Sequence, residues 1–183
     1  MVRHGETEWS KSGKHTGLTD IPLLPAGEQA ARALAPRLAA RAFAKVLTSP
    51  LARARQTCGL AGFAGVAENC DDLVEWDYGA YEGRRTSEIL TERPGWKLFE
   101  DGCPGGETLA HVAARADRLI ALLRGFGGDA LLFAHRDILR VIAARWVALP
   151  AIEARRLYLN TASIGILGYD HDPSEPIIRS INI

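Results

Sequence analysis

The sequence predicts a three-layer α/β/α domain built around a largely parallel sheet. Predicted strands and helices alternate along most of the chain, which is the order that parallel α/β folds require. The apolar run "ALLFA" at 130–134 follows a Gly-Gly-Asp turn and is typical of a strand covered by helices on both faces. The 183 residues are 47% hydrophobic and contain neither a repeat nor a linker, so we expect residues 1–183 to form a single domain.

The first predicted helix spans residues 26–42. Its apolar residues recur every four positions, at Ala30, Leu34 and Leu38. Pro36 should kink this helix or end it early, because proline lacks the N–H that the helix interior uses.

A strand at "AKVLTSP", residues 44–50, comes next and leads into a second helix. Ser49 is suited to cap this helix and Pro50 to occupy its first position. Arg53 then falls in the first turn of the helix.

The second half of the chain predicts two helices and a group of short strands. A long helix over 107–124 presents one apolar face, formed by Leu109, Val112, Ala116, Leu119 and Leu123. After the buried strand, a helix over 137–148 is expected. Beyond it we predict three short strands at 155–163, 164–170 and 176–183, with turns at Ala162–Ser163 and His171–Pro176.

Composition excludes several classes of function. The 22 basic and 22 acidic residues cancel to a formal net charge of zero, so nucleic-acid binding receives no support. No apolar run approaches the roughly 18 residues that a membrane span needs. Cys58, Cys70 and Cys103 are odd in number and far apart, which predicts reduced thiols, mostly small buried hydrophobes, in a cytoplasmic protein.

Polar groups stand at three predicted strand ends or helix starts. They are the adjacent pair Arg3 and His4, then Arg53, and then His135. In a parallel sheet the carboxyl ends of neighbouring strands meet at one edge, so these groups would converge there with helix N-termini. Guanidinium forks and free helix N–H groups bind phosphate. A neutral imidazole, with an ordinary pKa of about 6.5, is a competent nucleophile at phosphorus. Glu75, in "VEWDYGAYEG", would then serve as the proton donor.

Each group taken alone also has a structural interpretation. His4 and Arg3 would be ordinary exposed residues, His135 would bond a backbone carbonyl, and Arg53 and Glu75 would be solvated or ion-paired. Their joint occurrence at strand ends favours the phosphate site.

The motifs "RHGETEW", "SPLARARQT", "EWDYGAYEG" and "FAHRDILRVIAARW" occur in this order along the chain. The sequence thereby resembles the histidine phosphatase superfamily, in the branch of phosphoglycerate mutases and small sugar-phosphate phosphatases. The resemblance implies a phosphoglycerate mutase-like fold and a phosphohistidine on His4. It further implies that Arg3, Arg53 and His135 hold the phosphoryl group, that Glu75 donates a proton, and that no metal or organic cofactor takes part.

A closer resemblance, to the fungal sedoheptulose-1,7-bisphosphatase type, rests on "TEWSKSGKHTGLTDIPLLPAGE", "DGCPGGET" and "LNTASIGILGYDHD" together with Ser10, where many relatives have asparagine. It implies a small phosphorylated metabolite as partner, with a sugar bisphosphate the leading substrate. Lys11, Lys14, Arg84 and Arg85 are predicted to hold a second phosphate, or else to form a solvated basic rim. The other predicted substrate-binding residues are Thr16, Gly17, Tyr78 and Arg136.

Three departures from the family pattern bear on the site. Ala134 and Arg136 flank the second histidine where serine and glycine are usual, and Leu24 replaces a threonine. Arg136 would either crowd the backbone or add a phosphate-facing cation. Arg140 matches a downstream arginine of the family and is equally suited to a structural role.

Other functions within the family remain open at this stage. A phosphoglycerate mutase is less favoured because the chain is short and an open pocket favours transfer to water. A protein phosphohistidine phosphatase is opposed by the long loop from Thr86 to Gly106, whose Trp96 and Phe99 would cover the site. A homodimer through the late strands, Trp146 and Tyr158 is an alternative to packing those aromatic residues in the core.

The first strand appears truncated, because only Met1 and Val2 precede Arg3. Strands are typically five or six residues long, and a frayed terminus would not position a nucleophile. We therefore expect the true start to lie upstream. If the chain begins at Met1, a catalytically impaired phosphate-binding module becomes the alternative from a different class.

Overall fold

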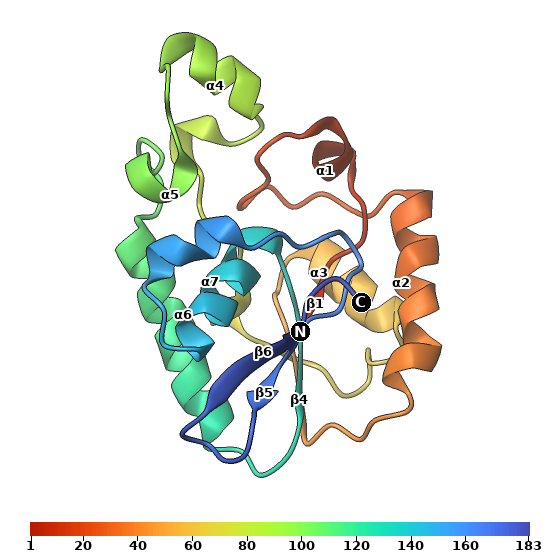
Figure 1. The fold of residues 1–183 in the computed structure, drawn as a ribbon. Coiled ribbons are helices and arrows are strands. Elements are labelled where there is room, and N and C mark those ends of the chain that lie inside the picture. Colours follow the sequence, from red (N-terminus) through yellow and green to blue (C-terminus); the bar gives the residue numbers. More distant parts are fainter.

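The computed structural model describes residues 1–183 and contains a four-stranded sheet in which every neighbouring pair of strands is parallel (Figure 1). The strand order is β1-β4-β2-β3. Its strands are β1 (Val2–Arg3), β2 (Lys45–Thr48), β3 (Glu68–Asn69) and β4 (Ala130–Ala134). The largely parallel central sheet of the sequence prediction is confirmed.

Side chains of the two central strands alternate between two hydrophobic cores, as the period of two in a strand requires. Val46 of β2 and Phe133 of β4 lie in one core, whereas Leu47 and Leu132, one residue away in each strand, lie in the other. Helices α2 (Pro25–Leu38) and α3 (Ala52–Leu60) cover the first face, and α6 (Leu109–Arg124) and α7 (Arg136–Trp146) cover the second (Figure 1). This is the predicted three-layer α/β/α arrangement.

The first two helices differ in detail from the prediction. Helix α2 ends at Leu38, soon after Pro36, and its buried stripe includes Ala31 rather than Ala30. Helix α3 begins at Ala52, later than expected, because the Ser49 hydroxyl is bonded to His135 as well as accepting the Leu51 N–H at 3.3 Å. Ser49 is therefore not the helix cap that the sequence suggested.

The predicted strand over 155–163 is wrong. Residues Ala151–Arg156 form a 3₁₀ helix, η3, because the carbonyl oxygens of Ala154 and Arg155 turn inward to accept hydrogen bonds from Arg140. The other two strands are present as β5 (Ile166–Tyr169) and β6 (Pro176–Ser180), which form a separate antiparallel pair.

Strand β1 has only two residues, yet it is held on both sides. Val2 and Arg3 pair with Phe133 and Ala134 of β4, and Val2 forms an antiparallel bridge with Ile164. The Gly165 N–H donates to the Met1 carbonyl at 2.8 Å. These bonds replace the support of a longer strand, so the expectation that so short a strand would leave Arg3 and His4 unpositioned is wrong.

The predicted loop from Thr86 to Gly106 contains two helices, α4 (Thr86–Glu92) and α5 (Leu98–Asp101). Trp96, between them, is buried against His15 and Tyr81, and Phe99 packs on Trp76. The smaller elements are α1 (Glu8–Ser12), η1 (Asp71–Leu73) and η2 (Gly79–Tyr81).

Several further sequence expectations can be compared with the structure. All three cysteines are free, and Cys58 is buried in the core, where desolvation raises its pKa to about 12. Trp146 is a core residue rather than an exposed one, whereas Tyr158 is exposed. None of the helices combines the length and apolarity that crossing a bilayer requires.

Candidate active site

The carboxyl ends of three neighbouring strands bring the predicted groups together. His4 follows β1, His135 follows β4, and Ser49, which leads into the helix of Arg53, follows β2. The two imidazole rings lie with centroids 5.2 Å apart. The predicted convergence of these side chains at one sheet edge is therefore observed.

Glycine at position 5 follows from the packing of the loop after β1. A Cβ built on Gly5 would lie 2.5 Å from the carbonyl oxygen of Gly27, which no real side chain tolerates. The Gly5 N–H donates to the Thr57 hydroxyl at 3.0 Å, and this hydroxyl donates to the Arg53 carbonyl at 2.7 Å. The glycine thus lets the His4 segment lie directly against α2 and α3.

His4 is a buried, neutral imidazole with a defined tautomer. Its Nδ1 lies 2.7 Å from the Gly5 carbonyl oxygen, which can only accept, so Nδ1 carries the hydrogen and Nε2 the lone pair. Burial, together with the positive charges of Arg3 and Arg53, holds the pKa of His4 well below its ordinary value. The ring is therefore an unprotonated nucleophile at neutral pH.

His135 and Arg53 form a buried pair behind His4. Arg53 Nε donates to His135 Nδ1 at 3.0 Å, and His135 Nε2 lies 2.7 Å from the Ser49 hydroxyl. The other Arg53 nitrogens donate to the carbonyl oxygens of Thr16, Gly17 and Thr19. Burial, with Arg53 the next cause, holds the pKa of His135 well below its ordinary value. Arg53 thereby connects the 16–19 loop to the histidine pair.

Arg3 has donors that the protein does not use. Its Nη1 donates to the Leu159 carbonyl at 2.6 Å, and no carboxylate pairs with its guanidinium. Its Nε is buried without any partner. Desolvation lowers the pKa of Arg3 to about 10, so the group remains charged at neutral pH. A buried cation without an anionic partner is unfavourable unless a ligand supplies the negative charge.

Glu75 occupies the N-terminus of α7. Its carboxylate oxygens accept the N–H groups of Asp137 at 3.1 Å and Ile138 at 3.0 Å, and also that of Trp76 at 3.0 Å. Burial, followed by the charge of Asp137, raises the pKa of Glu75. A carboxyl group with a raised pKa is suited to donate a proton. The N-terminus of α7, expected to hold phosphate, is therefore occupied by this acid.

Arg3, His4 and Glu75 line a polar cavity of about 80 Å³, whereas Arg53 and His135 are buried outside its lining. This volume suits a phosphoryl group, and the rest of a substrate would extend through the mouth. The lining residues are Arg3, His4, Ser10, Gly13, Lys14, His15, Thr16, Glu75, Tyr78, Thr86 and Arg136.

The predicted second-phosphate residues divide into two groups. Lys14 lines the cavity, with its Nζ 5.6 Å from the Trp9 ring centre, and Lys11 is exposed on α1. Arg84 donates to both carboxylate oxygens of Glu92, and Arg85 donates to a backbone carbonyl at 2.8 Å.

The remaining predicted substrate-binding residues also differ in position. Ser10, Thr16, Tyr78 and Arg136 line the cavity. Gly17 lies behind it, where its N–H donates to Glu82 and its carbonyl accepts from Arg53. Arg136 donates to both oxygens of Asp137 at 3.1 Å, so it is held as a cation at the wall rather than crowding the backbone.

Sequence reasoning missed several residues of the site. Asp137 and Ser49 are buried partners of the predicted groups, and Gly13 and Thr86 line the cavity. His15 also lines it, in agreement with the segment "SKSGKH", which the sequence places near the mouth of the site. One signal existed for Asp137: an acid in the first turn of α7 with arginines beside it and three residues on. No sequence signal indicates that Thr86, far along the chain, faces the same cavity.

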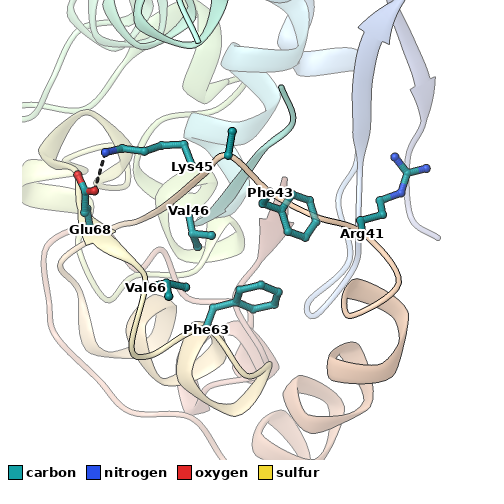
Figure 2. A pocket seen from close by; sticks show the side chains of 8 residues that line it. Arg41, Phe43, Lys45, Val46, Phe63, Val66 and Glu68 are labelled. Atoms are coloured by element: carbon teal, nitrogen blue, oxygen red, sulfur yellow. Dashed lines mark hydrogen bonds and ion pairs between the residues drawn. The ribbon is translucent and has the colours of Figure 1, made fainter. Parts of the chain in front are cut away.

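A second cavity, of about 260 Å³, lies at the opposite end of β2 (Figure 2). Phe43, Phe63 and Val66 form most of its apolar lining. The Lys45 side chain at its rim is paired with Glu68, as Figure 2 shows. It contains no histidine and no unpaired buried charge, so it has none of the features of the first cavity.

The fold and the first cavity define a phosphatase of the α/β class, with histidine and arginine side chains gathered at the carboxyl edge of the sheet. Comparison with known proteins agrees. The family model of the histidine phosphatase superfamily (branch 1) matches residues 1–182. The chain belongs to this superfamily.

The relatives include proteins named as phosphatases and others named as probable phosphoglycerate mutases, such as one of Enterobacter sp. that is 32% identical over 186 residues, covering 94% of this chain and 85% of the relative. The acid phosphatase of Mycobacterium tuberculosis is 40% identical over 175 residues, covering 93% of this chain and 86% of the relative. Sedoheptulose 1,7-bisphosphatase of Saccharomyces cerevisiae is 40% identical over 184 residues, covering 81% and 67%. A solved structure of a Mycobacterium tuberculosis open reading frame matches with a TM-score of 0.93, at 38% identity, over 100% of this chain and 95% of the other.

Proposed function

We propose that this phosphatase hydrolyses a small sugar phosphate through a phosphohistidine on His4, without a metal ion. The observation that carries the proposal is the neutral His4 ring, whose Nε2 lone pair is free beside the unpaired guanidinium of Arg3. Arginine stabilises the charge that develops on the transferring phosphoryl group. The leading substrate is a sugar bisphosphate such as sedoheptulose 1,7-bisphosphate.

The reaction proceeds in two balanced steps. First, His4 Nε2 forms a bond to phosphorus while the bond from phosphorus to the leaving oxygen breaks, and Glu75 gives its proton to that oxygen. The products are the alcohol, phosphohistidine and the Glu75 carboxylate. Second, Glu75 takes a proton from water as the water oxygen bonds to phosphorus. The N–P bond breaks, and its electron pair returns to Nε2.

The charges at the cavity support a substrate with more than one anionic group. Arg3, Lys14 and Arg136 all line it, so two cations remain when Arg3 holds the reacting phosphoryl group. The yeast relative is named as a sugar bisphosphatase. Arg84 is paired with Glu92 outside the cavity lining, whereas Lys14 and Arg136 line the cavity. Lys14 is therefore the better candidate to hold a second phosphate, together with the donors that Arg136 keeps free of its pair with Asp137.

The first experiment measures hydrolysis of p-nitrophenyl phosphate with a metal chelator present. We expect turnover by the wild-type protein and none by His4→Ala, with a trapped, acid-labile phosphoprotein only in the wild type. Equally feeble rates in both proteins, with inorganic phosphate still raising the Tm, would instead indicate a phosphate-binding module. If the protein is active without the chelator and loses that activity when the chelator is added, the metal-independent mechanism is contradicted.

A substrate panel then tests the sugar bisphosphate. We expect kcat/KM for sugar bisphosphates to exceed that for the matching monophosphates, and Lys14→Gln and Arg136→Gln to reduce this preference. Lys11→Gln serves as the matched control, because Lys11 lies outside the cavity. A preference for monophosphates, or interconversion of phosphoglycerates in place of hydrolysis, would overturn the proposed substrate.

A further inference from the structure

Asp137 is a fully buried carboxylate that the two-step reaction does not use. It accepts a hydrogen bond from the Tyr78 hydroxyl at 2.6 Å and another from Arg140 Nη1 at 2.6 Å. Arg136 donates to both of its oxygens at 3.1 Å. Four donors from three side chains saturate this carboxylate, which makes it a permanent anion inside the protein.

Asp137 also lies next to the proposed proton donor. Its backbone N–H donates to Glu75 Oε2 at 3.1 Å, so the two carboxyl groups share the N-terminus of α7. Their surroundings differ. Asp137 has two guanidinium partners, whereas Glu75 accepts only backbone N–H groups. When the environments of two nearby carboxyl groups push their pKa values apart, one is suited to be the acid and the other to be a fixed charge.

We propose that Asp137 is a positioning residue for the proton-donating step, because its paired, buried charge favours the protonated form of the adjacent Glu75 carboxyl. The inference rests on the proposed role of Glu75. Tyr78 and Arg136, which Asp137 holds in place, line the same cavity as Glu75. Loss of Asp137 would therefore alter both the charge on the acid and the wall beside it.

The other charged groups around Glu75 set the expected direction of the effect. Two neighbouring carboxyl groups that share one helix N-terminus resist double ionisation. Burial raises the pKa of Glu75, and the charge of Asp137 raises it further. Burial also acts to raise the pKa of Asp137, but the guanidinium groups of Arg136 and Arg140 outweigh it and lower that pKa. Five titratable or charged groups face Glu75. They are Arg3 of β1, Arg53 of α3, Tyr78 immediately before η2, and Arg136 and Asp137 of α7. Asp137 is the only anion among these groups. Removing its charge leaves the three arginines facing Glu75, so we expect the pKa of Glu75 to fall.

The test is the ratio of kcat/KM for an alkyl phosphate to that for p-nitrophenyl phosphate, measured against pH. An alkoxide needs the proton of Glu75 to leave, whereas p-nitrophenolate does not. The ionisation of His4 affects both substrates and cancels in the ratio. The ionisation of the phosphate differs between the two substrates but is the same for every variant, so the comparison is between the midpoints of the variants. In the wild type the ratio falls as the pH rises through the pKa of Glu75.

Asp137→Asn should move the midpoint of this fall downward by about one pH unit or more. Arg136→Gln removes a cation facing Glu75 and should move it upward. Asp117→Asn, which breaks an exposed pair with Arg145, is the matched control and should leave it unchanged. An unchanged midpoint in Asp137→Asn, with both substrates slowed equally, would overturn the proposal. If that variant does not fold, Arg136→Gln decides: an upward shift supports the proposal, and an unchanged or lowered midpoint overturns it.

Glu75→Gln separates this proposal from the one on which it rests. If Glu75→Gln keeps the wild-type ratio at every pH, Glu75 is not the acid, and the mechanism itself fails. If Glu75→Gln loses the alkyl activity selectively but Asp137→Asn keeps the wild-type midpoint, only the role of Asp137 is wrong.

Discussion

Two cavities of the molecule lie at opposite ends of the same strand, β2, and differ in how the charges in their lining are paired. At the carboxyl end, Arg3 is buried without an anionic partner, beside two histidines that burial keeps neutral. At the amino end, Lys45 is paired with Glu68 (Figure 2), and Arg41 is paired with Asp129.

The comparison teaches that cavity size does not identify the reactive site of this protein. The larger of the two, about 260 Å³, is lined mostly by hydrophobic residues, and the charged side chains in its lining are paired. The smaller one, about 80 Å³, contains the buried guanidinium of Arg3, which has no anionic partner in the protein. A negatively charged ligand would supply that partner. Unpaired buried charge is the feature that a structural role does not explain.

Arg3→Met gives the largest expected effect on this comparison. The side chain keeps its length and loses its charge, so kcat/KM for aryl phosphates should fall about a hundredfold to a thousandfold. Stability should stay unchanged or rise, because a buried charge without a partner is removed. Steady-state kinetics and thermal melts of the same preparations measure both. Retained activity would mean that the unpaired guanidinium is not part of the site.

Acid should destabilise the protein through the first cavity. Burial lowers the pKa of His15 to about 4 and holds the pKa values of His4 and His135 well below 6.5. In the unfolded chain these rings take up protons as the pH falls below about 6.5, and in the folded protein they do not, so stability is lost there. Each histidine that stays neutral in the folded protein accounts for about 1.4 kcal/mol of lost unfolding free energy at pH 5.5.

Glu75, with its raised pKa, acts in the opposite sense, but it is one group against three. The net loss between pH 7.5 and 5.5 should be roughly 2 to 4 kcal/mol. Urea titrations at the two pH values measure it. His15→Phe should reduce the loss, whereas an identical loss in this variant would show that His15 is protonated in the folded state.

The sequence predicted which polar groups meet at the sheet edge and missed the residues that contact them. His4, Arg53 and His135 stand at strand ends, where parallel pairing brings them together regardless of loop detail. The hydrogen bond between Ser49 and His135 and the one from Tyr78 to Asp137 join residues far apart in the sequence, which no local pattern encodes. The 155–163 segment failed for a similar reason: the carbonyl oxygens of Tyr158 and Leu159 accept hydrogen bonds from distant side chains, those of Asn182 and Arg3, rather than from a neighbouring strand.

Phe63→Ala tests the second cavity as a packing feature. The ring lies 5.8 Å from Phe43 and 5.9 Å from Phe133, between centroids, and it is half-buried. Full burial would make its loss cost 3 to 5 kcal/mol, so about 2 kcal/mol is expected here. The kcat of the folded protein should not change. A selective loss of kcat with normal stability would indicate that the two ends of β2 are coupled.

Lys45→Gln should have the smallest effect, and it is the sharpest test of the contrast with Arg3. The Lys45 ammonium is paired with Glu68 at the surface, where such pairs contribute about 0.5 kcal/mol or less. Neither kcat/KM nor its dependence on salt should change beyond error, and the free energy of unfolding should fall only slightly. The double variant Lys45→Gln, Glu68→Gln should be no less stable than the single one, because it leaves no unpaired charge. If Lys45→Gln reduced activity as Arg3→Met does, charge pairing would no longer distinguish the two cavities, and the assignment of the reactive site would have to rest on the histidines alone.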